Sequence, residues 1–267
     1  MIDRRRLLQL GGIHGAALLA QGVLVAEQQG VDSSKRGALL LCGGGKLSDF
    51  VLDTFCKLGR AEGNRMVLVP TASPRSDEED YSPWLEVWRG KGWREVSVVH
   101  AKSHQEAMRE GFGGELEGAT AVWIGGGDQS RLVERYLGTV FLERLKGWWE
   151  VGGVVGGTSA GAAVMSRRMI SGGEVEPEIR ECFGWLPEVI VDQHFSEKKR
   201  LERLKRAVFK HPELVGVGID EGTGWLIKGG SGTVIGSGRI HEVRYMVETS
   251  QFEVSERSGE IEVPHCR

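Results

Sequence analysis

The chain of 267 residues has few cysteines, no long apolar run and little net charge, and each shortage excludes a class of protein. Its four cysteines form no Cys-x-x-Cys pair, which excludes a zinc framework and a small disulfide scaffold. No apolar run reaches the length of a membrane span. A net charge of −3 gives no general attraction to nucleic acid. With 40% hydrophobic residues, the chain is long and apolar enough for one large α/β domain.

Basic residues open the chain, and a short, mildly apolar stretch follows them. Arginines at positions 4–6 precede two leucines, and residues 13–26 are moderately hydrophobic. This order is typical of an export signal, and it resembles a twin-arginine signal, which carries folded proteins. We therefore expect an exported protein, periplasmic or extracellular; an ordinary amphipathic helix at the N-terminus would instead indicate a cytoplasmic one. The expected organisation is a signal over 1–26, a linker over 27–36 and one domain over 37–267.

Strands and helices alternate from Gly37 onward. Short apolar runs bounded by glycine or proline indicate buried strands, and amphipathic stretches between them indicate helices. Such alternation predicts an α/β fold with a mainly parallel sheet and helices on both faces. Short glycine-bounded strands near the C-terminus are expected to extend this sheet or close it with a hairpin. The expected strands are 38–42, 65–69, 96–99, 121–124, 154–155, 189–191, 217–221, 225–227, 233–235 and 241–247, and the expected helices are 47–58, 83–89, 105–109, 130–136 and 141–149.

A serine flanked by glycines stands where a strand is expected to turn into a helix. The segment Gly157-Thr158-Ser159-Ala160-Gly161 fits the Gly-x-Ser-x-Gly pattern and follows strand-forming valines. In such a turn the hydroxyl is lifted clear of the sheet, and the helix N-terminus behind it stabilises negative charge. We predict that Ser159 is a nucleophile; the alternative is a glycine-rich turn without chemistry.

Ligands of parallel α/β sheets bind outside the carboxyl ends of the strands, where three glycine-rich loops are expected to meet. These loops span 43–46, 125–129 and 157–161. The first two lack the glycine spacing of a phosphate loop or a dinucleotide fingerprint. Three successive glycines do let backbone approach a ligand closely. The second loop is therefore a candidate for an oxyanion donor and for a polar contact from Gln129, although a permissive turn would look the same.

His194 follows another expected strand and should share the edge on which Ser159 lies. Histidine titrates near neutral pH, so it can take a serine proton and return it to a leaving amine. A purely structural histidine is the alternative. A third group should orient the imidazole, and the residues leave four candidates open: Glu174, Glu176, Asp192 and Glu221.

A helix with a basic first turn is expected after His194. Lys198, Arg200 and Arg203 either point at the site and recognise a substrate carboxylate, or form a solvated basic face. Acidic residues interleave with them and no aromatic stacking platform is present. Nucleic acid is therefore not an expected partner.

Four short motifs, taken together and in this order, resemble the cyanophycinase and aspartyl dipeptidase family of serine peptidases. The resemblance covers about 37–240 and implies a three-layer α/β sandwich akin to class I glutamine amidotransferases. It implies Ser159 as nucleophile and His194 as base. By its offset from the serine, Glu174 matches the acidic member of the family, with Glu176 as the alternative. The motifs are Gly125-Gly126-Gly127-Asp128-Gln129, Gly157-Thr158-Ser159-Ala160-Gly161-Ala162, Asp192-Gln193-His194-Phe195-Ser196 and Asp220-Glu221-Gly222-Thr223.

The same resemblance implies an oxyanion hole and a substrate pocket. Gly127 and Ala160 would donate backbone N–H groups to the oxyanion. Lys198 stands where the cyanophycinase branch usually has arginine, and it lacks the bidentate fork of that residue. The reaction class is therefore better specified than the substrate. The pocket residues that match the branch are Gln129, Asp192, Gln193, Arg200 and Arg203.

We expect a serine-type peptidase that hydrolyses peptide bonds at aspartyl residues, in cyanophycin or in related Asp-containing peptides. The alternatives are an aspartyl dipeptidase and a non-catalytic binding domain that retains the serine turn. The implied enzyme uses no metal and no organic cofactor. Its expected partner is a peptide or a cyanophycin-like polymer. We expect no stable membrane span after processing, and the sequence is compatible with either a monomer or a homodimer.

Overall fold

The structure is a computed structural model, and it describes residues 36–262. The expected export signal over 1–26 lies outside these residues, as does the expected linker over 27–36 apart from Arg36. Within 36–262, the helices are all too short or too polar to cross a membrane.

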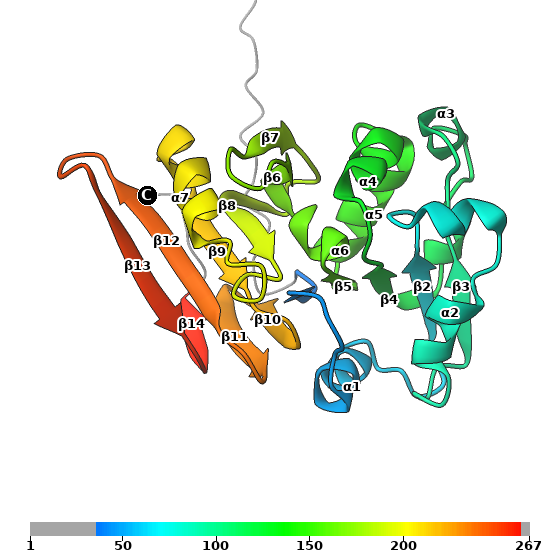
Figure 1. The fold of residues 1–267 in the computed structure, drawn as a ribbon. Coiled ribbons are helices and arrows are strands. Elements are labelled where there is room, and N and C mark those ends of the chain that lie inside the picture. The colour runs from blue at the N-terminus through cyan, green and yellow to red at the C-terminus, as the bar shows by residue number, and fades with distance from the viewer. Residues whose placement is uncertain (1–35, 263–267) are drawn as a thin grey trace, which may run out of the picture. The chain divides into compact units, whose positions relative to one another are not determined.

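Fourteen strands form two sheets in the described residues (Figure 1). The eight-stranded sheet has the order β14-β11-β10-β1-β5-β4-β2-β3, and the six-stranded sheet has the order β13-β12-β9-β8-β6-β7. The strands are β1 (Leu39–Cys42), β2 (Arg65–Val69), β3 (Glu95–Val98), β4 (Ala119–Ile124), β5 (Val154–Thr158), β6 (Ser166–Gly172), β7 (Glu178–Glu181), β8 (Leu186–Gln193), β9 (Val215–Ile219), β10 (Thr223–Lys228), β11 (Ser231–Gly236), β12 (Ile240–Met246), β13 (Gln251–Arg257) and β14 (Glu260–Glu262).

Helices fill the connections between strands, close to where amphipathic patterning placed them. In α1, Ser48 caps the N-terminus by accepting from the Val51 N–H, and the apolar positions face the core. The helices are α1 (Asp49–Leu58), η2 (Pro74–Glu78), α2 (Ser82–Leu85), η3 (Glu86–Trp88), α3 (His104–Ala107), η4 (Gly114–Leu116), α4 (Gln129–Tyr136), α5 (Val140–Glu150), α6 (Ala160–Ala163) and α7 (Leu201–Lys210).

The α/β class is as expected, but a single, mainly parallel sheet is not what forms. Both sheets are mixed: β3, β2, β4, β5 and β1 run parallel, whereas β10, β11 and β14 add antiparallel strands. In the other sheet β6, β8 and β9 are parallel, and the pairs of β7, β12 and β13 are antiparallel. Gly229 and Gly230 explain one reversal, because a two-residue turn with positive φ closes a hairpin between β10 and β11.

The core lies between the two sheets and on their outer faces. Alternation along β1 shows the first of these layers: Leu39 and Leu41 join the large cluster shared with β8, β9, α4, α5 and α6, and Leu40 and Cys42 face α1. On the six-stranded sheet, α7 contacts β9 and β12 and covers a third cluster around Val208 (Figure 1). The parallel strands of both sheets are thereby fixed with their carboxyl ends toward the candidate site.

Candidate active site

Ser159 occupies the junction between β5 and α6 in an unusual backbone conformation. Its φ is 52° and its ψ is −111°, and its N–H donates to the Cys42 carbonyl at 2.9 Å. The flanking glycines are required sterically: a Cβ on Gly157 would lie 2.5 Å from the Gly161 oxygen, and one on Gly161 would lie 2.2 Å from the Ile124 oxygen. A strained φ at a non-glycine residue persists only where the surroundings hold it, as these close contacts do.

His194 follows the last residue of β8 and meets Ser159 across the two sheets. Its Nε2 lies 2.9 Å from the Ser159 Oγ. Its own φ is 50°, and its N–H donates to the Gly43 carbonyl at 2.7 Å. The structure therefore brings together the serine and the histidine that the sequence placed at one edge.

The residue on the other imidazole nitrogen is Glu221, which follows β9. The Glu221 Oε1 lies 2.5 Å from the His194 Nδ1. Because a carboxylate only accepts, Nδ1–H donates to Glu221 and leaves Nε2 free to accept from the Ser159 hydroxyl. The register explains the contact: in the parallel pair, Gln193 of β8 lies opposite Ile219 of β9, so the next residues share one edge.

The geometry does not place Glu174, the acidic member implied by offset from the serine, at the imidazole. Glu174 is exposed in the turn between β6 and β7. Glu176 forms an ion pair with Lys210 and lies 3.8 Å from Arg206. An offset along the chain misleads here because Glu174 lies in the turn between β6 and the edge strand β7, whereas His194 and Glu221 follow β8 and β9, which pair with each other. Glu221 was one of four carboxylates that the residues left open.

The first glycine loop makes room for the histidine and the glutamate. A Cβ on Gly44 would lie 2.3 Å from the His194 Cε1, and one on Gly45 would lie 2.5 Å from the Glu221 Oε2. Both glycines have positive φ, of 99° and 67°, which disfavours any side chain. The loop therefore serves as clearance for the imidazole and its partner, a role that the run of glycines alone did not reveal.

Asp220 ties the loop that carries Glu221 to the turn that carries His194. Its Oδ1 accepts from the Ser196 N–H at 3.2 Å and lies 3.1 Å from His241 Nε2, and its Oδ2 accepts from the Arg239 N–H at 3.0 Å. Burial alone raises the pKa of Asp220, but these hydrogen bonds outweigh it and hold the pKa below its usual value. The Asp220 carboxylate therefore holds the loop of Glu221 and the turn of His194 together.

The segments that carry the two expected oxyanion donors both adjoin Ser159. Ala160 is the next residue, at the start of α6. A Cβ on Gly126 would lie 3.4 Å from the Ser159 Cβ, so the second glycine loop runs alongside the serine. Gly127 has φ 141°, and within the described residues neither its N–H nor that of Ala160 has a backbone acceptor. Gln129 anchors the end of this loop, since its Nε2 donates to the Ile170 carbonyl at 2.7 Å.

The residues expected to bind substrate form a buried network around Asp192. Asp192 is 1% exposed, and it accepts from Arg203 Nε at 2.9 Å and again from the same guanidinium. Arg200 lies 3.3 Å from Asp192 and also donates to the carbonyl and the amide oxygen of Gln193. Burial raises the pKa of Asp192, and the hydrogen bonds from Arg203 oppose that shift. The Arg203 guanidinium is thus already paired with a buried carboxylate. Of Lys198, Arg200 and Arg203, only Lys198 is exposed.

A hydroxyl, an imidazole and a carboxylate in line can activate the hydroxyl as a nucleophile. In such a line the imidazole can take the proton, and the carboxylate can stabilise the imidazolium that forms. The carboxylate is 38% exposed and the imidazole 17%, so the line opens to solvent at the glutamate end. Among residues 36–262, His, Cys, Asp and Glu side chains form no cluster of three that would hold a metal ion.

Comparison with known proteins identifies relatives for most of this chain. The model of peptidase family S51 matches residues 39–235. The cyanophycinase of Synechococcus elongatus is 37% identical over 201 residues, 71% of this chain and 62% of that protein. The cyanophycinase of Trichormus variabilis is 33% identical over 201 residues, 69% of this chain and 66% of that protein. The chain therefore spans less than two thirds of the length of the first of these relatives.

Two solved structures share the fold. A peptidase from an acI-B1 actinobacterium superimposes with a TM-score of 0.66 at 21% identity, covering 86% of this chain and 98% of that one. A putative peptidase E protein from Listeria monocytogenes gives a TM-score of 0.51 at 14% identity, covering 76% of this chain and all of that one. At these identities the likeness establishes the fold alone.

Proposed function

Because the chain belongs to peptidase family S51, we propose that it is a serine-type peptidase with Ser159 as nucleophile, His194 as general base and Glu221 as the residue that orients the imidazole. The observation that carries the proposal is the line of contacts at 2.9 Å and 2.5 Å from hydroxyl to imidazole to carboxylate. In the proposed reaction, Ser159 attacks an amide carbonyl, and the proton passes through His194 to the leaving amine.

The oxyanion of that reaction would be held by the N–H groups of Gly127 and Ala160. Support comes from three observations: Ala160 directly follows the serine, Gly126 next to Gly127 packs against it, and neither N–H has a backbone acceptor within 36–262. Preorganised donors of this kind stabilise the charge that develops in the transition state.

The proposed substrates are peptides with aspartyl residues, and cyanophycin is the first to test, because the two relatives described above are cyanophycinases. Lys198 offers an exposed charge for a substrate carboxylate. Arg203 would act indirectly, by holding Asp192 and through it the strand β8, which ends just before His194. An aspartyl dipeptidase acting on short Asp-X peptides is the alternative, and a binding domain without catalysis is the second.

Labelling with a fluorophosphonate probe tests the chemistry, and incubation with cyanophycin and with Asp-X dipeptides tests the substrate. We expect the probe to modify Ser159 in the wild-type chain and to leave Ser159→Ala unmodified. Release of dipeptides from the polymer supports cyanophycinase activity, whereas cleavage of Asp-X alone supports the dipeptidase. A wild-type chain that is folded but unlabelled would establish the binding domain instead.

A further inference from the structure

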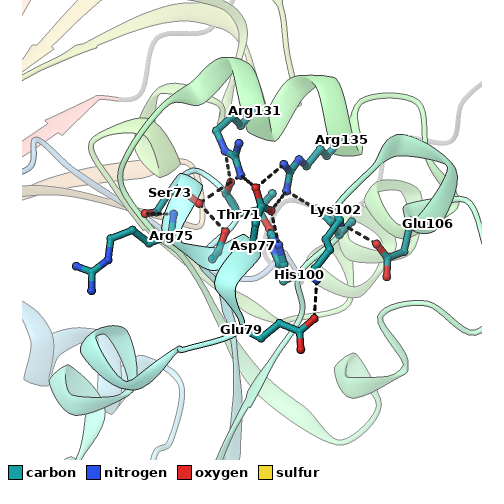
Figure 2. Close-up of polar contacts among 12 residues, drawn as sticks. Thr71, Ser73, Arg75, Asp77, Glu79, His100, Lys102, Glu106, Arg131 and Arg135 are labelled. Atoms are coloured by element: carbon teal, nitrogen blue, oxygen red, sulfur yellow. Dashed lines mark hydrogen bonds and ion pairs between the residues drawn. The ribbon is translucent and has the colours of Figure 1, made fainter.

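A polar cluster outside the proposed catalytic line, which consists of Ser159, His194 and Glu221, joins the loop after β2 to α4 (Figure 2). Its centre is Asp77 of η2, which accepts from Arg131 at 2.8 Å and from Arg135 at 2.8 and 3.2 Å. The hydrogen bond from Arg135 is the largest cause that holds the pKa of Asp77 well below its usual value; burial opposes it, and Arg131 adds to it. Asp77 is therefore an anion fixed by two arginines of one helix.

A chain of hydrogen bonds connects Asp77 to the base of the same loop. Because the carboxylate only accepts, His100 donates from Nε2 to Asp77 at 3.0 Å, and its Nδ1 then accepts from the Thr71 hydroxyl at 2.9 Å. Thr71 in turn accepts from the Tyr136 hydroxyl at 2.7 Å, and the Tyr136 oxygen accepts from the Ala101 N–H at 3.1 Å. Burial lowers the pKa of His100, which favours the neutral imidazole that this direction of bonds requires. Hydrogen bonds therefore fix this loop both at Thr71, near its start, and at Asp77.

Arg131 links the cluster to the candidate oxyanion donor. Its Nε donates to the Thr71 carbonyl at 3.1 Å, and its Nη2 donates to the Ser73 carbonyl at 3.4 Å, on either side of Ala72. The Ala72 carbonyl accepts from the N–H that follows Gly127 at 2.9 Å, and a Cβ on Gly127 would lie 2.4 Å from it. Arg131 therefore holds the backbone segment against which the Gly127 peptide packs.

We propose that Asp77, Arg131 and Arg135 are positioning residues that fix the Gly127 N–H for the oxyanion, an inference that rests on the proposed function. None of the three belongs to the catalytic line; they act through the 71–73 backbone. Loosening that backbone displaces one oxyanion donor. A displaced donor raises the barrier to the charged transition state without weakening the initial binding of a substrate.

The fluorophosphonate probe tests this inference because phosphonylation of Ser159 also develops negative oxygen charge beside Gly127. Labelling kinetics separate the limiting rate kinact from the binding constant KI. We expect Asp77→Asn and Arg131→Met to lower kinact by roughly 10- to 100-fold with KI unchanged, since small misplacements of catalytic groups have effects of that order. Arg131→Lys keeps the charge but cannot span both carbonyls, so its kinact should fall between those of Arg131→Met and wild type.

Glu79→Gln is the matched control. Glu79 lies on the same loop but pairs with Lys102 at the surface, 2.6 Å away, and among the described residues its side chain forms no hydrogen bond with the 71–73 backbone. Its kinact should equal that of wild type, with thermal unfolding confirming that every variant is folded. Equal kinact for folded Asp77→Asn and wild type would overturn the inference and leave the proposed function intact.

If the wild-type chain is not labelled, the proposed function is overturned. Hydrogen–deuterium exchange still tests whether Arg131 positions the 71–73 backbone and the Gly127 loop. In Arg131→Met, or in Arg131→Lys if the methionine variant does not fold, exchange should rise in peptides covering 70–73 and 125–129. Unchanged exchange in both segments would overturn the positioning role.

Discussion

Glu221 and Glu174 differ in one property that can be tested, which is contact with the imidazole of His194. Glu221 lies 2.5 Å from Nδ1, whereas Glu174 is an exposed turn residue. We predict that Glu221→Gln lowers kcat by roughly 10²- to 10⁴-fold, because an amide can present an N–H to the imidazole and favour the wrong tautomer. Glu174→Gln should retain the wild-type kcat.

The measurement is hydrolysis of cyanophycin or of an Asp-X dipeptide, whichever the wild-type chain cleaves, or fluorophosphonate labelling if it cleaves neither. Glu174→Gln is the control for the loss of one surface carboxylate. A large loss of activity in Glu174→Gln together with wild-type activity in Glu221→Gln would contradict the assignment and restore the member implied by offset from the serine.

Single residues also show where sequence reasoning ends. Ser159 and His194 could be placed because each follows a strand whose pattern is plain, and parallel strands share one carboxyl edge. The sequence does not show why position 44 must be glycine. Any side chain there would collide with the ring of His194, since a Cβ would lie 2.3 Å from it, and that ring is 150 positions later in the chain. The local sequence of Arg203 does not say whether its partner is a substrate or the buried Asp192.

Among the elements, β12 supports the site although it lies beyond residues 39–235, which the family model matches. His241 of β12 reaches Asp220 at 3.1 Å and the Ser196 Oγ at 3.2 Å, and its ring lies 4.8 Å from that of Phe195. We predict that His241→Leu lowers kcat by roughly tenfold, because the loops bearing Glu221 and His194 lose a shared tie.

His241→Gln serves as the matched comparison for β12, because its side-chain amide retains a donor for Asp220. The steady-state rates of both variants give the answer, with circular dichroism as the check on folding. A leucine variant as fast as wild type would show that the Ser196 and Arg239 N–H groups hold Asp220 without help from β12.

The order of elements was predictable from the sequence, but the pairing of strands was not. Helices α4 and α5 begin within one residue of their expected starts, since amphipathic patterns and caps are local. Hydrophobic runs carry no direction, so β10 in the eight-stranded sheet reads like a parallel strand until its antiparallel partner β1 is known. Strands β6 and β7 escaped notice altogether, because their polar residues resemble a loop.

At the scale of the whole molecule, the catalytic line crosses between the two sheets. Ser159 follows a strand of the eight-stranded sheet, and His194 follows a strand of the six-stranded one. Glu221 stands on the connection from β9 to β10, which passes from one sheet to the other. The cluster of buried side chains shared by both sheets therefore sets the distance between Ser159 and His194, the proposed nucleophile and base. Such long-range packing is the part that no local pattern encodes.

The free energy of unfolding should depend on pH through Asp77 in a direction that the structure fixes. The pKa of Asp77 is lowered in the folded chain, chiefly by Arg135, so its contribution is fully present above the unfolded pKa of about 3.9. It is lost as pH falls from that value toward the folded pKa. We predict that wild type is more stable than Asp77→Asn at pH 7, and that the difference shrinks below about pH 4. Urea unfolding followed by tryptophan fluorescence at pH 7, 5, 4 and 3 measures it, and a difference that grows on acidification would contradict the ion cluster.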